Sequence, residues 1–180
     1  MFITAGEFKG TSLLYPASKA FVRPTKAKVR QAVFNILQNR ICGSDFLDLF
    51  CGTGVMGLEA LSRGASFVQF VDKHTKYVQL NINRIMKHNI ELAYSISKMN
   101  VVDYLKHTHN QYDIVLLDPP WLKVSLFVDT LKALIEFDIL KKSSLVICEH
   151  PSDFQFEEVE GFTSSRIYKY GRTNLTIFEV

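Results

Sequence analysis

The sequence has few cysteines and no long apolar run, and both shortages exclude whole classes of protein. Only three cysteines occur in 180 residues, Cys42, Cys51 and Cys148, and no two of them form a C-x-x-C pair. A disulfide scaffold and a cysteine-based zinc or redox motif are therefore excluded, and a cytoplasmic location is expected. No apolar run approaches the ~20 residues of a membrane span, and the start MFITAGEFKG lacks the apolar core of a signal peptide. We therefore expect no membrane partner.

Acidic residues are scarce at the N-terminal end. Residues 1–40 contain seven Lys or Arg and a single acid, Glu7, so this segment carries a net charge of +6. The whole chain carries +3, which leaves −3 for residues 41–180. A basic segment on a slightly acidic body predicts a polyanionic partner, although a solvated helix face would give the same count.

Two elements are predicted within this basic extension, residues 1–40. Residues 2–15 are predicted to form a hairpin. A helix is predicted to begin at Pro24 and Thr25, because the apolar residues that follow have helical spacing; they are Val29, Ala32, Val33, Ile36 and Leu37. Its first turns hold Lys26, Lys28 and Arg30, although cations are disfavoured at the positive end of a helix dipole. An anionic ligand bound there would account for these cations. The alternative is that the fold tolerates the small unfavourable energy of cations at an exposed helix start.

From residue 45 onward, strand-like and helix-like segments alternate. Five strands are predicted within residues 45–50, 66–72, 93–98, 112–118 and 143–150, and helices lie between them. The tail, residues 164–180, reads as two more strands joined at YGRTN. The pattern predicts an α/β domain over residues 41–180. We expect a doubly wound, seven-stranded, mostly parallel sheet with helices on both faces and an antiparallel hairpin at one side.

Polar residues follow or end almost every predicted strand. They are Asp48, Asp72, Asn100, Asp118 and Glu149. Because the carboxyl ends of parallel strands meet at one rim, and ligands of such sheets bind there, these residues mark the expected site.

A glycine-rich turn lies between the first predicted strand and its helix. The sequence DLFCGTGVMG places Gly52, Gly54 and Gly57 in G-x-G-x-x-G spacing, with Asp72 20 residues after Gly52. This context predicts an adenosine-type ligand with Asp72 on its ribose, against the alternative of a tight turn and an ordinary surface acid. Asp48 would repel a pyrophosphate but attract the sulfonium and ammonium of S-adenosylmethionine, so it favours that cofactor over NAD.

The sequence VLLDPPW ends the fourth predicted strand in a stiff, acceptor-rich turn. Pro119 and Pro120 fix two φ angles and offer no N–H donors. We expect the Asp118 carboxylate and the Pro119 carbonyl to accept the two N–H bonds of an exocyclic base amine, with Trp121 stacked on the base. The amine could then displace the methyl group of a sulfonium. A Pro-Pro loop with a buried Trp is the alternative. The histidines form no ligand set, so no metal is expected.

Three stretches, DLFCGTGVMGLEALSRGA, FVDK and LLDPPW, resemble class I S-adenosylmethionine-dependent methyltransferases that modify base amines. The N-terminal ITAGEFKG and VRPTKAKVRQAVFNIL are similar to the bacterial family that methylates a guanine N2 in 16S ribosomal RNA. The resemblance implies a set of cofactor-binding residues: Asp48, Phe50, Gly52, Gly54, Gly57, Asp72, Lys73, Asn100 and Val101. It implies catalytic roles for Asp118, Pro119, Pro120 and Trp121, and RNA contacts for Arg23, Thr25, Lys26 and Arg30.

The same resemblance implies the partner. It predicts a monomer that acts at a guanine-966-type site in an assembled or assembling 30S subunit. Two other functions stay open at this point: an adenine-N6 methyltransferase of DNA or RNA, since the DPPW motif occurs there too, and a non-catalytic RNA-binding factor of ribosome assembly.

Overall fold

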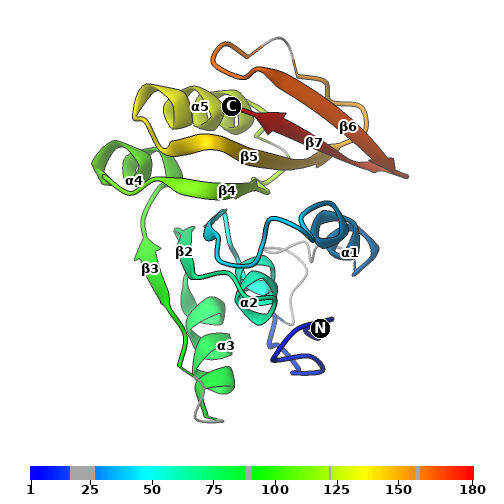
Figure 1. Ribbon diagram of the computed structural model, residues 1–180, viewed down its shortest axis with the longest axis vertical. Coiled ribbons are helices and arrows are strands. Elements are labelled where there is room, and N and C mark those ends of the chain that lie inside the picture. Colours follow the sequence, from blue (N-terminus) through cyan, green and yellow to red (C-terminus); the bar gives the residue numbers. More distant parts are fainter. Residues whose placement is uncertain (17–26, 88–90, 122, 157–158) are drawn as a thin grey trace.

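A seven-stranded sheet runs through the middle of the molecule (Figure 1). The computed structural model describes residues 1–16, 27–87, 91–121, 123–156 and 159–180. The strands are β1 (Asp45–Leu49), β2 (Phe67–Asp72), β3 (Tyr94–Lys98), β4 (Tyr112–Leu117), β5 (Leu140–Pro151), β6 (Ser164–Tyr170) and β7 (Thr173–Glu179). Their order across the sheet is β3-β2-β1-β4-β5-β7-β6. β1 to β5 pair in parallel, whereas β7 is antiparallel to both β5 and β6.

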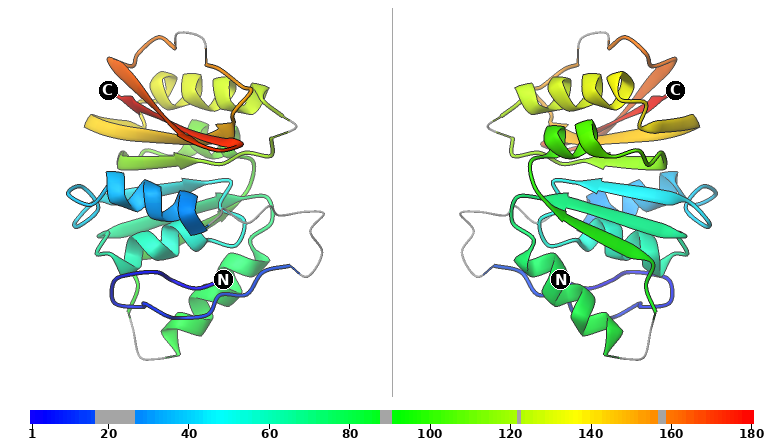
Figure 2. Two further views of the ribbon diagram at one scale, coloured as in Figure 1. Left: turned by 90° about the vertical axis from the view of Figure 1, so that its right-hand side faces the viewer. Right: turned by 90° about the vertical axis from the view of Figure 1, so that its left-hand side faces the viewer.

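Helices cover both faces of the sheet (Figure 2). One face packs against α1 (Ala27–Ile36), α2 (Val55–Ser62) and α3 (Lys76–Met86), and the other against α4 (Val101–His107) and α5 (Ser125–Glu136). Side chains of alternate strand residues pack into the two apolar cores on opposite faces of the sheet. Phe46 in β1 joins the core under α1–α3, whereas its neighbours Leu47 and Leu49 join the core under α4 and α5. Burial on both faces explains why the central strands read as continuous apolar runs.

The predicted fold class is therefore confirmed, including the number of strands and the antiparallel C-terminal hairpin. Among the described residues, no helix is both long and apolar enough to cross a membrane. Pro24 and Thr25, the predicted start of the first helix, lie outside the described residues. The predicted N-terminal hairpin takes a looser form, with one antiparallel bridge between Phe2 and Ser12 in place of two strands. Its backbone turns through Gly6 and Gly10, which have φ angles of 81° and 86°.

The N-terminal segment packs into the main core. Ile3, Phe8 and Leu13 are each at most 4% exposed and belong to the same apolar cluster as α2 and α3. The described part of residues 1–40 thus shares one core with residues 41–180. Its assignment as an RNA-facing extension stays a prediction.

Candidate functional site

The strand register brings the predicted site residues to one rim. In the parallel ladders, Leu49 pairs with both Val71 and Leu117. The residues that follow these three lie at the carboxyl ends of β1, β2 and β4, and they include Asp72 and Asp118. The glycine turn, Asp72 at the end of β2 and the DPPW turn therefore meet at one edge of the sheet. Ligands of such sheets bind at this edge.

The glycine turn connects β1 to α2 with a left-handed backbone. Phe50 has a φ of 61°, Gly52 54° and Gly54 74°. A non-glycine residue in this region is uncommon and is often found at functional sites. A Cβ on Gly57 would lie 2.3 Å from the Phe70 ring, so only glycine lets α2 pack this closely on β2. Packing of α2 on β2 is thus one reason for the glycine at position 57, in addition to any need to admit a ligand.

Asp72 is joined directly to this turn. Its Oδ2 accepts a hydrogen bond from the Gly52 N–H at 2.9 Å, and its Oδ1 accepts one from the His74 N–H at 2.8 Å. The side chain is half-buried. Each carboxylate oxygen can accept more than one bond, so a carboxylate fixed in this way is suited to receive ribose hydroxyls.

Asp48 lies beneath the turn and not at its surface. The side chain is 2% exposed, and its Oδ2 accepts a hydrogen bond from the Gly57 N–H at 2.9 Å. Burial raises the pKa of Asp48 to about 7, opposed by the Gly57 bond and reinforced by the Asp72 charge. A buried carboxyl with this pKa gains its charge near neutral pH, where a neighbouring cation would favour the ionised form.

The raised pKa predicts that Asp48 makes the fold less stable as pH rises. Its pKa of about 7 in the folded protein lies above the unfolded value of 3.8, so the folded state binds more protons between these limits. The contribution of protonated Asp48 to the stability of the fold is fully present below about pH 4. It is lost as pH rises to about 7. D48N should therefore be more stable than the wild type at pH 8, by about 1–4 kcal/mol. Urea unfolding at pH 5 and pH 8 measures this; equal pH slopes for both proteins would contradict it.

Three further predicted cofactor contacts follow β2 and β3. Asn100 is the N-cap of α4, where its Oδ1 accepts a hydrogen bond from the Val102 N–H at 3.1 Å. Val101 is 3% exposed, and Lys73 is exposed just beyond Asp72. Asn100 therefore has a structural role in starting α4, and its contact with adenine stays a prediction, as do those of Val101 and Lys73.

The DPPW turn follows β4 as expected, with one correction. Asp118 and Trp121 are partly exposed, Pro119 is buried and Pro120 is exposed. The turn was expected to be rich in acceptors for a ligand, but the Pro120 carbonyl accepts a hydrogen bond from the Lys123 N–H at 2.9 Å. That bond closes the turn, because the chain must reverse into α5. The predicted roles of Asp118, the Pro119 carbonyl and the Trp121 ring stay predictions.

Arg30 corrects the predicted RNA-contacting set. Its side chain is 3% exposed, its Nε lies 3.6 Å from Glu59 Oε2, and it donates a hydrogen bond to the Phe2 carbonyl at 2.8 Å. A buried guanidinium that is paired within the protein is not available to a phosphate, so the prediction for Arg30 is wrong. The other predicted members, Arg23, Thr25 and Lys26, lie outside the described residues.

Two buried polar residues next to the site were missed from the sequence. Glu59 in α2 is 0% exposed and accepts hydrogen bonds from Thr4 and the Ala5 N–H. Asn81 in α3, also 0% exposed, exchanges two hydrogen bonds with the Leu14 backbone and donates one to the Thr53 carbonyl inside the glycine turn. In the sequence, each is a single polar residue on an apolar helix face. Such a residue indicates a buried side chain with hydrogen-bond partners, because polar groups are rarely buried without them.

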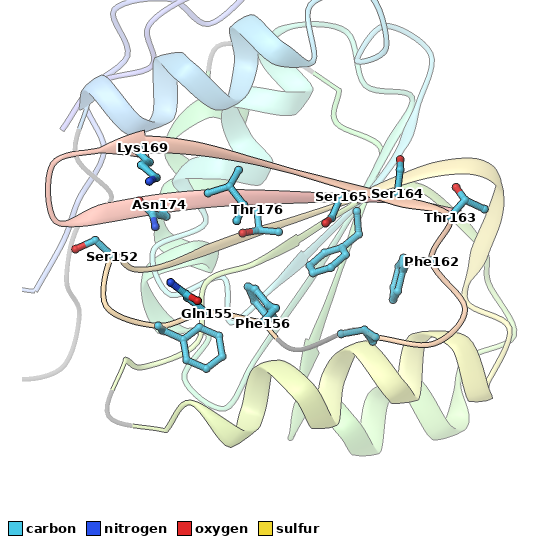
Figure 3. A pocket seen from close by; sticks show the side chains of 14 residues that line it. Ser152, Gln155, Phe156, Phe162, Thr163, Ser164, Ser165, Lys169, Asn174 and Thr176 are labelled. Atoms are coloured by element: carbon cyan, nitrogen blue, oxygen red, sulfur yellow. The ribbon is translucent and has the colours of Figure 1, made fainter.

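Cavities lie elsewhere on the molecule. One of about 540 Å³ lies between the β6–β7 hairpin and the segment that follows β5, and its lining includes Phe156, Phe162 and Lys169 (Figure 3). Another of about 430 Å³ includes Asp45 and Lys141 in its lining. Neither of these two cavities includes the glycine turn or the DPPW turn. Within the described residues, no group of three or more His, Cys, Asp or Glu is placed to hold a metal ion.

Known proteins share both the sequence and the fold. Residues 1–179 match the protein family described as Conserved hypothetical protein 95. The chain is 34% identical over 181 residues to the Ribosomal RNA small subunit methyltransferase D of Haemophilus influenzae, an alignment that covers 93% of this chain and 92% of the relative. The solved structure of yhhF from Escherichia coli has a TM-score of 0.85 at 26% identity and covers 99% of this chain and 97% of that one.

A more distant structure shows the same fold with ligands. It is the 16S rRNA N2 G1207 methyltransferase of Thermus thermophilus, solved with AdoMet and guanosine. Its TM-score is 0.71 at 19% identity, and the similarity covers 91% of this chain and 44% of that one. At 19% identity, this comparison shows a shared fold only.

Proposed function

The chain belongs to the family described as Conserved hypothetical protein 95, and from that premise we propose that it methylates ribosomal RNA. The resemblance seen in the sequence motifs is confirmed by this match and by the small-subunit rRNA methyltransferase among its relatives. In the proposed reaction, S-adenosylmethionine donates a methyl group to the exocyclic N2 amine of a guanine in 16S ribosomal RNA.

The donor set at the rim fits S-adenosylmethionine. Asp72, fixed by the Gly52 N–H, would accept hydrogen bonds from the ribose. Asp48, with its pKa raised to about 7, would favour the cationic amino-acid end of the cofactor, and the glycine turn would cover it. Phe50, Lys73, Asn100 and Val101 would complete the contacts. When bound, the cofactor supplies an electrophilic methyl group on a sulfonium.

The DPPW turn would hold the acceptor. Asp118 and the Pro119 carbonyl would accept the two N–H bonds of the guanine N2 amine, and the partly exposed Trp121 would stack on the base. Held in this way, the amine would direct its lone pair at the methyl group that bound S-adenosylmethionine would supply, and it would lose one proton to solvent on methylation. Positioning carries most of the acceleration. The target nucleotide has to leave its stack to reach the rim.

The observation that carries the proposal is the meeting of three motifs at one rim. Asp72 bonds to the glycine turn, and Leu117, just before Asp118, pairs in register with Leu49, just before that turn. We further propose that the protein acts as a monomer on an assembled or assembling 30S subunit at a guanine-966-type site.

Methyl transfer to undermethylated 30S subunits tests the proposal. The protein is incubated with the subunits and isotope-labelled S-adenosylmethionine, and the modified nucleotide is mapped by mass spectrometry. We expect label on one guanine base. Label on adenine would favour the adenine-N6 alternative, and RNA binding without any transfer would favour a non-catalytic assembly factor.

A further inference from the structure

A long stretch of the chain around α3 contains no acidic residue. Residues 73–90 hold Lys73, Lys76, Arg84 and Lys87 but no Asp or Glu. The body of the chain, residues 41–180, has an overall charge of −3, so this stretch departs from its surroundings. The contrast makes α3 a second basic region, separate in sequence from residues 1–40.

The cations of α3 project away from the core. Val78, Ile82 and Ile85 are at most 1% exposed and form the inner face of the helix. Lys76, Arg84 and Lys87 are all exposed. Lys87 lies eleven positions after Lys76, which corresponds to a rise of about 16 Å along the helix axis. These three cations, which we call the α3 basic face, thus extend over about three helical turns.

The α3 basic face forms no ion pair with the acids of the described residues. Within the described part of the chain, none of its three cations forms an ion pair; the pairs that are present involve Arg30, Arg63, Lys141 and Arg166. The first turn of α3 contains no acid, and Lys76 lies at the positive end of the helix dipole. The dipole disfavours Lys76 but favours Arg84 and Lys87 at the other end of α3. Repulsion between Arg84 and Lys87 and the cost at Lys76 would both be relieved by an external anion.

The helix that carries this face begins just after the rim and contacts the N-terminal segment. Lys73 follows Asp72 directly and precedes α3. On the other side, Asn81 of α3 is bonded to Leu14, and Figure 2 shows the N-terminal segment beside α3. α3 and the described N-terminal segment, residues 1–16, are therefore packed side by side.

We propose that the α3 basic face binds phosphates of the ribosomal RNA substrate. The inference rests on the proposed function, and it assigns the RNA-contacting role that Arg30 does not fill to Lys76, Arg84 and Lys87. Charge complementarity favours a polyanion, and RNA fits better than a lipid surface. An interfacial membrane helix turns its apolar side to the lipid, whereas Val78, Ile82 and Ile85 of α3 are buried in the core, and its exposed apolar side chains are Leu80 and Met86.

A triple neutralisation with a matched control tests this proposal. The test variant is K76Q/R84Q/K87Q. The control, K106Q/K132Q/K142Q, removes the same charge from exposed positions on α4, α5 and β5. Affinity for undermethylated 30S subunits is measured from 50 to 300 mM salt. We expect the test variant to bind at least about 10-fold more weakly at low salt, and its salt slope to fall by about 2–3. The control should stay within about twofold of the wild type.

The outcomes separate this inference from the proposed function. Both variants should keep the thermal midpoint and the S-adenosylmethionine affinity of the wild type, since all substituted side chains are exposed. Equal losses in both variants would assign the effect to net charge and overturn the inference, as would unchanged binding by the test variant. Failure of the wild type to methylate the subunits would instead overturn the proposed function.

Discussion

Replacing Asp118 with alanine is expected to lower the rate of methyl transfer at least about 1,000-fold, with S-adenosylmethionine affinity within about twofold of the wild type. Asp118 follows β4, which lies between β1 and β5 and is paired on both sides. Its position is therefore set by an interior strand that is hydrogen bonded on both sides. Without the carboxylate, the guanine amine loses an acceptor that fixes its lone pair toward the methyl group, and such positioning accounts for large factors in rate. Single-turnover methylation of 30S subunits measures the effect.

Two matched variants sharpen this prediction. D118N keeps the shape and one acceptor oxygen, but its NH₂ group faces the N–H bonds of the target, so we expect a loss of about 100-fold or more. D129A removes a carboxylate from an exposed position on α5 and should leave the rate unchanged. Activity of D118A within tenfold of the wild type would show that the DPPW turn does not hold the reacting amine.

Replacing Glu59 with glutamine is expected to destabilise the fold by about 3–5 kcal/mol. Glu59 is fully buried; it forms ion pairs with Arg63 at 2.9 Å and with the buried Arg30 at 3.6 Å, and it accepts bonds from the N-terminal segment. Removing one partner of a buried pair leaves the other charge without compensation, which is where the large losses arise. For a chain of this size the thermal midpoint should fall by about 6–20 °C.

A second substitution tests the cause of this loss. If the uncompensated charge of Arg30 is responsible, E59Q/R30M should recover at least about 1 kcal/mol relative to E59Q, because an apolar side chain replaces the buried cation. E136Q on the exposed side of α5 provides a control and should change stability by less than about 0.5 kcal/mol. A free energy of unfolding for E59Q within 1 kcal/mol of the wild type would contradict the assigned role of Glu59.

The sheet and the rim were predictable from the sequence because both depend on short-range patterns. Continuous apolar runs, helical spacing and glycines mark the elements locally, and parallel strands place their carboxyl ends together. That is why Gly52 and Asp72, 20 residues apart, could be predicted to meet, and they are hydrogen bonded at 2.9 Å. The DPPW turn was found for the same reason, although the internal bond of the Pro120 carbonyl was not.

The partners of buried polar groups were decided only by the tertiary structure. Glu59 meets Thr4 across 55 residues, and Asn81 meets Leu14 across 67. From the sequence, Arg30 was predicted to be an exposed cation. Its ion pair with the buried Glu59 shows that it lies inside the fold. The overall charge of residues 41–180 likewise concealed the acid-free α3, because a sum along the chain averages over surfaces that folding separates. Sequence alone determined which elements form and where their ends meet. Folding decided which distant polar groups pair and which charges share a surface, since both depend on distances in space that no local pattern encodes.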